Sequence, residues 1–392
     1  MPGPLASLRV LDFTTLFPGP FATMYLADLG AEVVKVESPD RPDGGRAMGL
    51  SDGETSALHD LLGRSKKTIA LNLKQPGSGD VVKRLVQTYD ILVEQFRPGV
   101  MARLGVGYQA LSEVNPQLIY CALTGYGQTG PLRERAGHDL NYTALAGVAC
   151  HIGRRESGPV PLMVPIADIS GAATALLGIL AAEVHRRETG EGQFVDVSMF
   201  DSVAAWNAMP LALYLAGGTE PQREGMRLNG ATYFDYYRTR DGEFLSVAGL
   251  EPKFWQEFCR AIERPDLYAP GLQLEPEAQA HVRAEIEKTV AQRTLQEWTS
   301  LFEHLDACVE PVLSVPRWAR HPQTQARGLI VQTPKPDGTT QKQIGSPIQF
   351  SRCESRYDHV GAAVGEHTRE VLIRVGYSDG EIQRLTCAGI VA

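Results

Sequence analysis

The chain has 392 residues, of which 43% are hydrophobic and 21% are charged. At roughly 150 residues per domain this length predicts two to three domains, and the composition excludes collagen, coiled-coil and disordered chains. Lys and Arg total 38 against 46 Asp and Glu, a formal net charge of −8. That balance argues against a protein whose main partner is a nucleic-acid backbone.

We expect no signal peptide in this sequence. Its first residues lack the charged and apolar regions of a signal peptide, and the longest apolar stretch, Ile169 to Val184, is interrupted by polar residues and glycines. We therefore expect a cytoplasmic protein without a membrane helix. The six cysteines are far apart and form no CxxC pair, which predicts neither a zinc site nor a disulfide framework.

Strand and helix patterns alternate over the first half of the chain. Expected strands cover residues 8–13, 32–37, 68–73, 91–94 and 118–123, and expected helices cover 20–29 and 77–88. This alternation predicts a Rossmann-like α/β domain, with a parallel sheet and helices on its faces. Ligands of such sheets bind beyond the carboxyl ends of the strands. The corresponding segments here are residues 14–19, 95–103 and 124–128.

A long helix from about residue 170 to 187 and a strand at 193–198 continue the pattern, which changes after Gly217-Gly218. Two β-runs then flank a turn at Asp241-Gly242, and charged helical segments follow. We expect a discontinuous large α/β domain and a smaller α+β domain. The expected ranges are 1–220 for the first part of the large domain, 225–325 for the small domain and 326–392 for the return to the large domain.

Three residues are candidates for chemistry. Asp168 stands before the long helix, where it either caps the helix or places a carboxylate beside free N–H groups that also stabilise a negative substrate oxygen. His138 lies in a polar Gly-His-Asp-Leu-Asn-Tyr cluster; it is either structural or a proton carrier suited to neutral pH, with Asp139 orienting it or capping a helix. Glu251 precedes Pro252 at a predicted helix start, where an acidic residue commonly complements the helix dipole.

Cations stand near predicted strand ends. Lys74, Arg97 and Arg103 are each either solvated surface residues or, with the aromatic Phe96 and Tyr126 close by, ligands for a phosphate-bearing nucleotide. The sequence contains no GxGxxG after the first strand, no P-loop, no HExxH and no Gly-x-Ser-x-Gly elbow. We therefore expect no redox dinucleotide cofactor and no metal.

Several ordered motifs along nearly the whole chain resemble the class III CoA-transferase and α-methylacyl-CoA racemase family, the CaiB/BaiF type. The matching segments are Leu8 to Phe13 with Pro18-Gly-Pro20, Asp28 to Glu37, Glu94 to Gly99, Gly125 to Gly130, Gly190 to Gln193, and Gly365 to Thr368. The resemblance implies an interlocked homodimer, an acyl-CoA substrate and no cofactor beyond the CoA moiety. By motif correspondence, the CoA-binding residues are Leu16, Lys74, Gln95, Phe96, Arg97, Arg103, Gly125 and Tyr126.

The family uses the aspartate that Asp168 matches in two ways. The racemase branch implies a pair of proton carriers, Asp168 and His138, with Glu251 setting the histidine tautomer and N–H groups at the helix start holding the thioester oxygen. The expected reaction is then epimerisation at the 2-position of a 2-methyl-branched acyl-CoA. The transferase branch implies that Asp168 is a covalent nucleophile in acyl-CoA:carboxylate CoA transfer.

Sequence features point to both branches. Residues Met163 to Ala167 resemble the transferase pattern, whereas the glycine-rich transferase loop is absent. A protein that binds acyl-CoA without turnover is a third interpretation, which the Asp168, His138 and Glu251 set disfavours.

Overall fold

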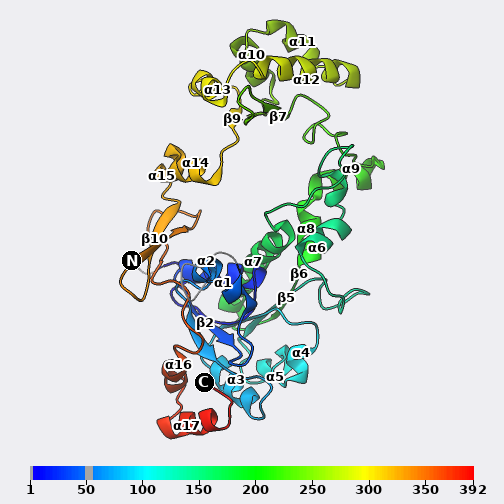
Figure 1. Ribbon diagram of the computed structural model, residues 1–392. Coiled ribbons are helices and arrows are strands. Elements are labelled where there is room, and N and C mark those ends of the chain that lie inside the picture. The colour runs from blue at the N-terminus through cyan, green and yellow to red at the C-terminus, as the bar shows by residue number, and fades with distance from the viewer. Residues whose placement is uncertain (1–2, 49–55) are drawn as a thin grey trace. The chain divides into compact units, whose positions relative to one another are not determined.

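The computed structural model describes residues 3–48 and 56–392 (Figure 1). Contacts divide the chain into two compact units: unit 1 comprises Met1–Ala146, Leu162–Trp206 and Pro322–Ala392, and unit 2 comprises Gly147–Pro161 and Asn207–His321. Unit 2 is thus larger than the range 225–325 expected for the small domain. The segment 147–161 is tied to it by hydrogen bonds from His151 to Asn207 and from Arg154 to Asp235, long-range contacts that local sequence patterns do not reveal.

Unit 1 is built on a six-stranded sheet in which every pairing is parallel, as predicted. Its strands are β1 (Arg9–Phe13), β2 (Glu32–Glu37), β3 (Lys67–Ala70), β4 (Ile91–Glu94), β5 (Ile119–Thr124) and β6 (Phe194–Ser198). Their order is β3-β2-β1-β4-β5-β6, the order of a doubly wound sheet. The winding reverses between β1 and β4, and this is where such sheets bind ligands.

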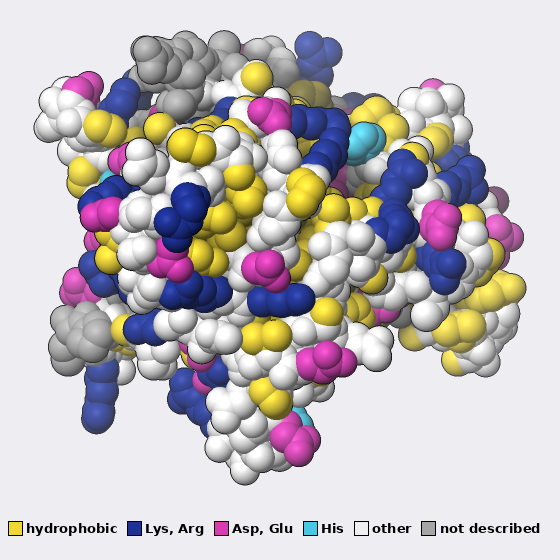
Figure 2. Space-filling view, turned by 90° about the horizontal axis from the view of Figure 1, so that it is seen from below, with side chains coloured by type: hydrophobic (Ala, Val, Ile, Leu, Met, Phe, Trp, Pro, Cys, Tyr) yellow, Lys and Arg dark blue, Asp and Glu magenta, His cyan; other side chains and the backbone are white. Residues whose placement is uncertain are grey.

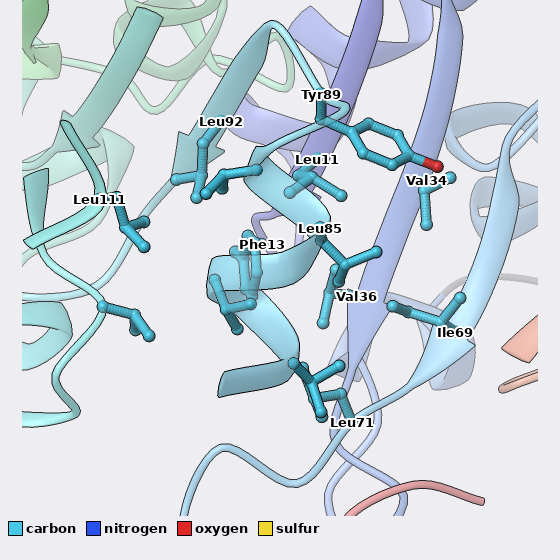
Figure 3. Packing of buried hydrophobic residues seen from close by; sticks show 14 of the residues in the cluster. Leu11, Phe13, Val34, Val36, Ile69, Leu71, Leu85, Tyr89, Leu92 and Leu111 are labelled. Carbon is cyan, nitrogen blue, oxygen red and sulfur yellow. The ribbon is translucent and has the colours of Figure 1, made fainter. Parts of the chain in front are cut away.

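One face of this sheet carries an apolar core (Figure 3). Alternate strand residues such as Leu11 and Val34 meet Leu85 of helix α3 (Ser78–Val86). Residues of α16 (Thr368–Arg374) and α17 (Asp379–Cys387) complete the cluster. The last segment of the chain therefore belongs to the same core as the first strands.

Helices α1 (Pro18–Asp28) and α7 (Ile166–Thr189) pack against each other and against strands of this sheet. Glycines let α7 lie close to β6 and α8. A Cβ atom added at Gly171 would lie 2.7 Å from Met199 Cγ, and one added at Gly178 would lie 2.7 Å from Val195 Cγ1. By length and composition alone α7 is apolar enough to cross a membrane. Its buried face against β5, β6 and α1 is the arrangement of a core helix.

Shorter elements complete unit 1. They are α2 (Ala57–Leu62), α4 (Val100–Arg103), α5 (Tyr108–Ser112), α6 (Asp139–Leu145), α8 (Met199–Trp206), α15 (Pro322–Ala326) and the 3-10 helix η1 (Gly44–Ala47). An antiparallel hairpin of β10 (Ile330–Pro334) and β11 (Thr340–Ile344) was not among the predicted elements.

Unit 2 has its own antiparallel sheet and its own core. The sheet joins β7 (Asp235–Arg238), β8 (Phe244–Val247) and β9 (Val309–Pro311), and β7 and β8 flank the predicted turn at Asp241-Gly242. Stacked Tyr233 and Trp255 rings, 3.9 Å apart, lie in its core. The helices are α9 (Ala208–Gly217), α10 (Pro252–Ala261), α11 (Tyr268–Gly271), α12 (Pro276–Val290), α13 (Leu295–Phe302), α14 (Val315–Arg320), η2 (Ala149–His151) and η3 (Pro265–Leu267).

Both basic and acidic side chains are spread over the face seen in Figure 2, among apolar and other polar ones. This mixture accords with the net charge of −8.

Candidate active site

Unit 1 contains a cavity of about 720 Å3 at the carboxyl ends of the central strands. Its walls include Leu16 and Phe17 after β1, Gln95 to Pro98 after β4, and Thr124 and Gly125 at the end of β5. These are the segments in which the parallel-sheet pattern predicts a crevice. The side chains of His138 and Asp168 line the same cavity.

Asp168 lies within the first turn of α7, because the helix begins at Ile166 with Pro165 as its N-cap residue. The interpretation of Asp168 as the helix cap is therefore wrong. The capping oxygen belongs to Asp139, whose Oδ1 accepts the N–H groups of Ala167 at 2.6 Å and Asp168 at 3.2 Å. Asp139 thus occupies these two N–H groups, and the expectation that N–H groups at the start of α7 hold a substrate oxygen stays a prediction.

The surroundings of Asp168 change its acidity. Burial, first, and the nearby Asp139 carboxylate, second, raise the pKa of Asp168 to about 7. Both causes disfavour the negative charge of Asp168. A carboxyl group with this pKa exchanges protons readily at neutral pH, which is what a general acid or base requires.

His138 is the N-cap residue of α6, and its backbone N–H donates to Asn141 Oδ1 at 3.1 Å. The preceding turn is held by Tyr142, whose hydroxyl donates to the Gly137 carbonyl oxygen at 2.5 Å. A Cβ atom at Gly125 would lie 2.5 Å from Tyr142 Oη, so glycine is required there. Gly125 thus leaves room for the Tyr142 side chain that holds the turn carrying His138.

Leu16 has an unusual backbone conformation on the cavity wall. Its φ of 63° lies in the left-handed region that bulky residues avoid. The Leu16 N–H donates to Asp43 Oδ1 at 2.8 Å, and Asp43 Oδ2 forms a buried ion pair with Lys35 Nζ at 2.5 Å. The folded structure holds Leu16 in this strained conformation through contacts that the sequence pattern does not reveal.

The residues predicted to bind CoA, Tyr126 excepted, divide between two cavities of unit 1. Gln95, Phe96, Arg97 and Gly125 line the larger cavity with Leu16. Lys74 and Arg103 line a smaller cavity of about 360 Å3 near the start of α3. Tyr126 packs edge-to-face on the cavity residue Tyr142, with ring centroids 5.1 Å apart.

Glu251 lies in unit 2, exposed, at the N-cap position of α10 directly before Pro252. The predicted helix start is therefore correct. Its relationship to His138, which belongs to unit 1, stays a prediction.

The sequence interpretation missed several cavity residues. Arg133 and Arg135 precede His138 in a loop where scattered cations resemble ordinary surface residues. Met48, Met163 and Met199 add apolar wall. Within residues 3–48 and 56–392, no cluster of three or more His, Cys, Asp or Glu side chains is arranged to hold a metal ion.

Comparison with known proteins identifies the family. The model of CoA-transferase family III matches residues 5–368. The chain is 34% identical to the human α-methylacyl-CoA racemase, over 99% of this chain and 97% of that protein. It is 32% identical to the mouse succinyl-CoA:glutarate CoA-transferase, over 99% and 90% of the two chains.

Among solved structures, a CAIB/BAIF family protein from Brucella suis superimposes with a TM-score of 0.84 at 26% identity, covering 96% of this chain and 100% of the other. The shared architecture extends over both units. The relatives of this chain include a racemase and a CoA-transferase. This protein is an enzyme of CoA-transferase family III.

Proposed function

We propose that this enzyme epimerises the 2-position of a 2-methyl-branched acyl-CoA by proton transfer between Asp168 and His138. The observation that carries the proposal is that both side chains line one cavity, at the point where the sheet reverses its winding. The 34% identity to the human α-methylacyl-CoA racemase supports the same reaction.

Epimerisation requires a proton to leave one face of the α-carbon and another to arrive on the opposite face. In the proposed reaction Asp168 serves one configuration and His138 the other, with an enolate-like thioester between the two transfers. The pKa of Asp168 near 7 suits it to both removing and returning a proton. Glu251 would set the tautomer of His138. Because the reaction moves only protons, it needs neither a metal nor a redox cofactor.

The CoA moiety would follow the residues that carry positive charge. Arg97 lines the larger cavity, and Lys74 and Arg103 line the smaller one. Guanidinium and ammonium groups bind phosphates through charge-assisted hydrogen bonds. Leu16, Gln95, Phe96, Gly125 and Tyr126 would contact the remainder of the CoA chain.

A second candidate reaction is acyl-CoA:carboxylate CoA transfer. The specific observation in its favour is the presence of Arg133 and Arg135 in the cavity, because guanidinium groups bind carboxylates and this reaction needs a carboxylic acid acceptor. Here the Asp168 carboxylate would attack the thioester and carry the acyl group as a mixed anhydride. The 32% identity to the mouse succinyl-CoA:glutarate CoA-transferase is consistent with this route.

One experiment separates the two reactions. The protein is incubated with a 2-methylacyl-CoA in D2O, with and without succinate, and the thioesters are analysed by mass spectrometry. Deuterium at the α-carbon without added acid supports epimerisation. Succinyl-CoA formed only when succinate is present, without deuterium uptake, supports CoA transfer. Binding without either product across a panel of thioesters supports the acyl-CoA-binding alternative.

We also infer that two copies of the chain associate. Helix α9 has no buried residue within the described chain, and its Tyr214 and Leu215 are 52% and 78% exposed. Apolar surface of this kind marks an association site. Sedimentation analysis should show a dimer, and Leu215→Glu should shift it toward monomer; a monomeric wild-type chain would contradict the inference.

A further inference from the structure

A buried carboxyl group stands directly before one wall of the larger cavity in unit 1. Glu94 is the last residue of β4 and is 5% exposed. The four residues that follow it, 95–98, all line the cavity. The reaction proposed above gives Glu94 no role, although a buried carboxyl group is costly for a fold to keep.

Glu94 is held by two hydrogen bonds, one of which reaches the cavity wall. Its Oε2 accepts the backbone N–H of Phe96 at 2.6 Å. The hydroxyl of Tyr120, on the neighbouring strand β5, donates to the same carboxyl group. Tyr120 is only 1% exposed. Burial therefore fixes this partner and, through it, the carboxyl group that accepts the Phe96 N–H.

Residues 95–98 are fixed at two further points. Gln95 Oε1 accepts the backbone N–H of Gly19 at 3.1 Å, which ties the turn to the start of α1. The Phe96 side chain is partly buried and packs against the apolar core. Arg97 is exposed and makes no hydrogen bond or ion pair with another described residue. The backbone of the turn is thus fixed, while the guanidinium group is available to a ligand.

The acidity of Glu94 indicates that its hydrogen bonds matter more than its charge. Burial raises the pKa of Glu94 to about 7, although the Phe96 N–H and the Tyr120 hydroxyl both oppose this rise. The carboxyl group is therefore partly neutral at pH 7, and none of the ion pairs in the described chain includes it. A neutral carboxyl group still accepts an N–H group.

We propose that Glu94 is a positioning residue for acyl-CoA binding, because it accepts the Phe96 N–H and so holds residues 95–98 in the conformation that contacts the CoA moiety. This inference rests on the proposed function, in which the turn binds CoA. Loss of the acceptor leaves the Phe96 N–H without its partner and allows the turn to rearrange. Acyl-CoA binding then weakens, whereas the proton transfers within bound substrate are unchanged.

Three variants test this role. Glu94→Leu fills similar space but cannot accept the Phe96 N–H, whereas Glu94→Gln keeps an acceptor oxygen for it and offers Tyr120 an N–H group. Tyr120→Phe is the matched control, because it removes the other partner of Glu94 and leaves the Phe96 N–H bonded. Isothermal titration calorimetry measures the affinity for CoA itself. Exchange of the α-proton of a 2-methylacyl-CoA gives KM and kcat.

Glu94→Leu should weaken CoA binding and raise KM at least about tenfold, with kcat within about threefold of wild type. Glu94→Gln and Tyr120→Phe should both bind CoA within about threefold of wild type. Wild-type affinity in Glu94→Leu would overturn the proposal, and so would a tenfold loss in Glu94→Gln. If circular dichroism shows that Glu94→Leu does not fold, Glu94→Ala makes the same comparison.

The two readouts separate this inference from the proposed function. A wild-type protein that binds CoA but exchanges no α-proton would contradict epimerisation alone, because CoA affinity still compares the Glu94 variants. Exchange by wild type together with equal CoA affinity in all variants would overturn the role of Glu94 alone.

Discussion

The carboxylate of Asp139 accepts the backbone N–H of Asp168 at 3.2 Å and, through its charge, raises the pKa of the Asp168 side chain. Asp139 thus caps the helix that carries Asp168, and its charge makes Asp168 a weaker acid. A helix start ordinarily favours a carboxylate anion. Here burial and a second carboxylate oppose that preference, so Asp168 titrates near neutral pH.

Replacing Asp139 by Asn should lower the pKa of Asp168. The amide oxygen can still accept the N–H groups of Ala167 and Asp168, but the negative charge is gone. Because Asp168 must be deprotonated to act as a base, the acidic limb of the rate of α-proton exchange should move from near pH 7 to lower pH. The pH–rate profiles of wild type and Asp139→Asn check this, and coincident limbs would show that Asp139 does not govern the titration.

Replacing Asp168 by Asn should stabilise the protein, and more so at pH 8 than at pH 5. The folded-state pKa of about 7 exceeds the ordinary 3.8, so ionising this group costs folding free energy. The cost is absent below the unfolded pKa, grows between about pH 4 and 7, and is complete above pH 7. Melting temperatures at the two pH values measure it, and a pH-independent difference between variant and wild type would contradict the shifted pKa.

Replacing Gly125 by Ala should reduce activity at least tenfold and destabilise the fold by about 1–3 kcal/mol, because a new Cβ would meet Tyr142 Oη at 2.5 Å. Displacing Tyr142 would move the turn that carries His138. Gly130→Ala is the control in the same loop: its φ of 84° makes alanine unfavourable, but no atom lies within 4 Å of the added Cβ. Urea unfolding measures the loss of stability, and turnover assays should show near-normal activity for the Gly130→Ala control. Equal turnover by the two variants would refute the packing argument.

Replacing Asp43 by Ala should destabilise the protein by about 3–5 kcal/mol, because Lys35 would be left buried without its partner. Despite burial, Lys35 holds the pKa of Asp43 below its usual value, so the contribution is present at neutral pH and is lost as the pH falls through the carboxyl range. Arg369→Ala, which breaks the exposed pair with Asp379, should change stability by less than about 1 kcal/mol. Urea unfolding at pH 7 compares the two, and similar losses would contradict the burial argument.

The sequence was enough to predict the parallel sheet and the segments at its carboxyl edge. Apolar runs, the alternation of strand and helix patterns, and glycine positions are all local signals. Leu11 and Val34 lie in strands for that reason. Long-range relationships were not predictable in the same way. The capping of Asp168 by Asp139, the left-handed backbone of Leu16 and the tie between His151 and Asn207 depend on residues 27 to 56 positions apart.

Candidate residues were likewise predictable where a motif surrounds them. His138 and Asp168 stand in recognisable segments, and the fold brings both to one cavity. Arg133 and Arg135 have no local pattern that separates them from surface cations, and only the cavity reveals them. The start of α7 was placed too late because Pro165, rather than an ordinary capping residue, precedes it.

The most direct test of the central claim is to give His138→Ala each pure epimer of a 2-methylacyl-CoA in D2O. If His138 and Asp168 are the two bases, epimerisation falls at least about 100-fold, while Asp168 still exchanges the α-proton of one epimer with retained configuration. Epimerisation by His138→Ala at the wild-type rate would contradict the two-base account.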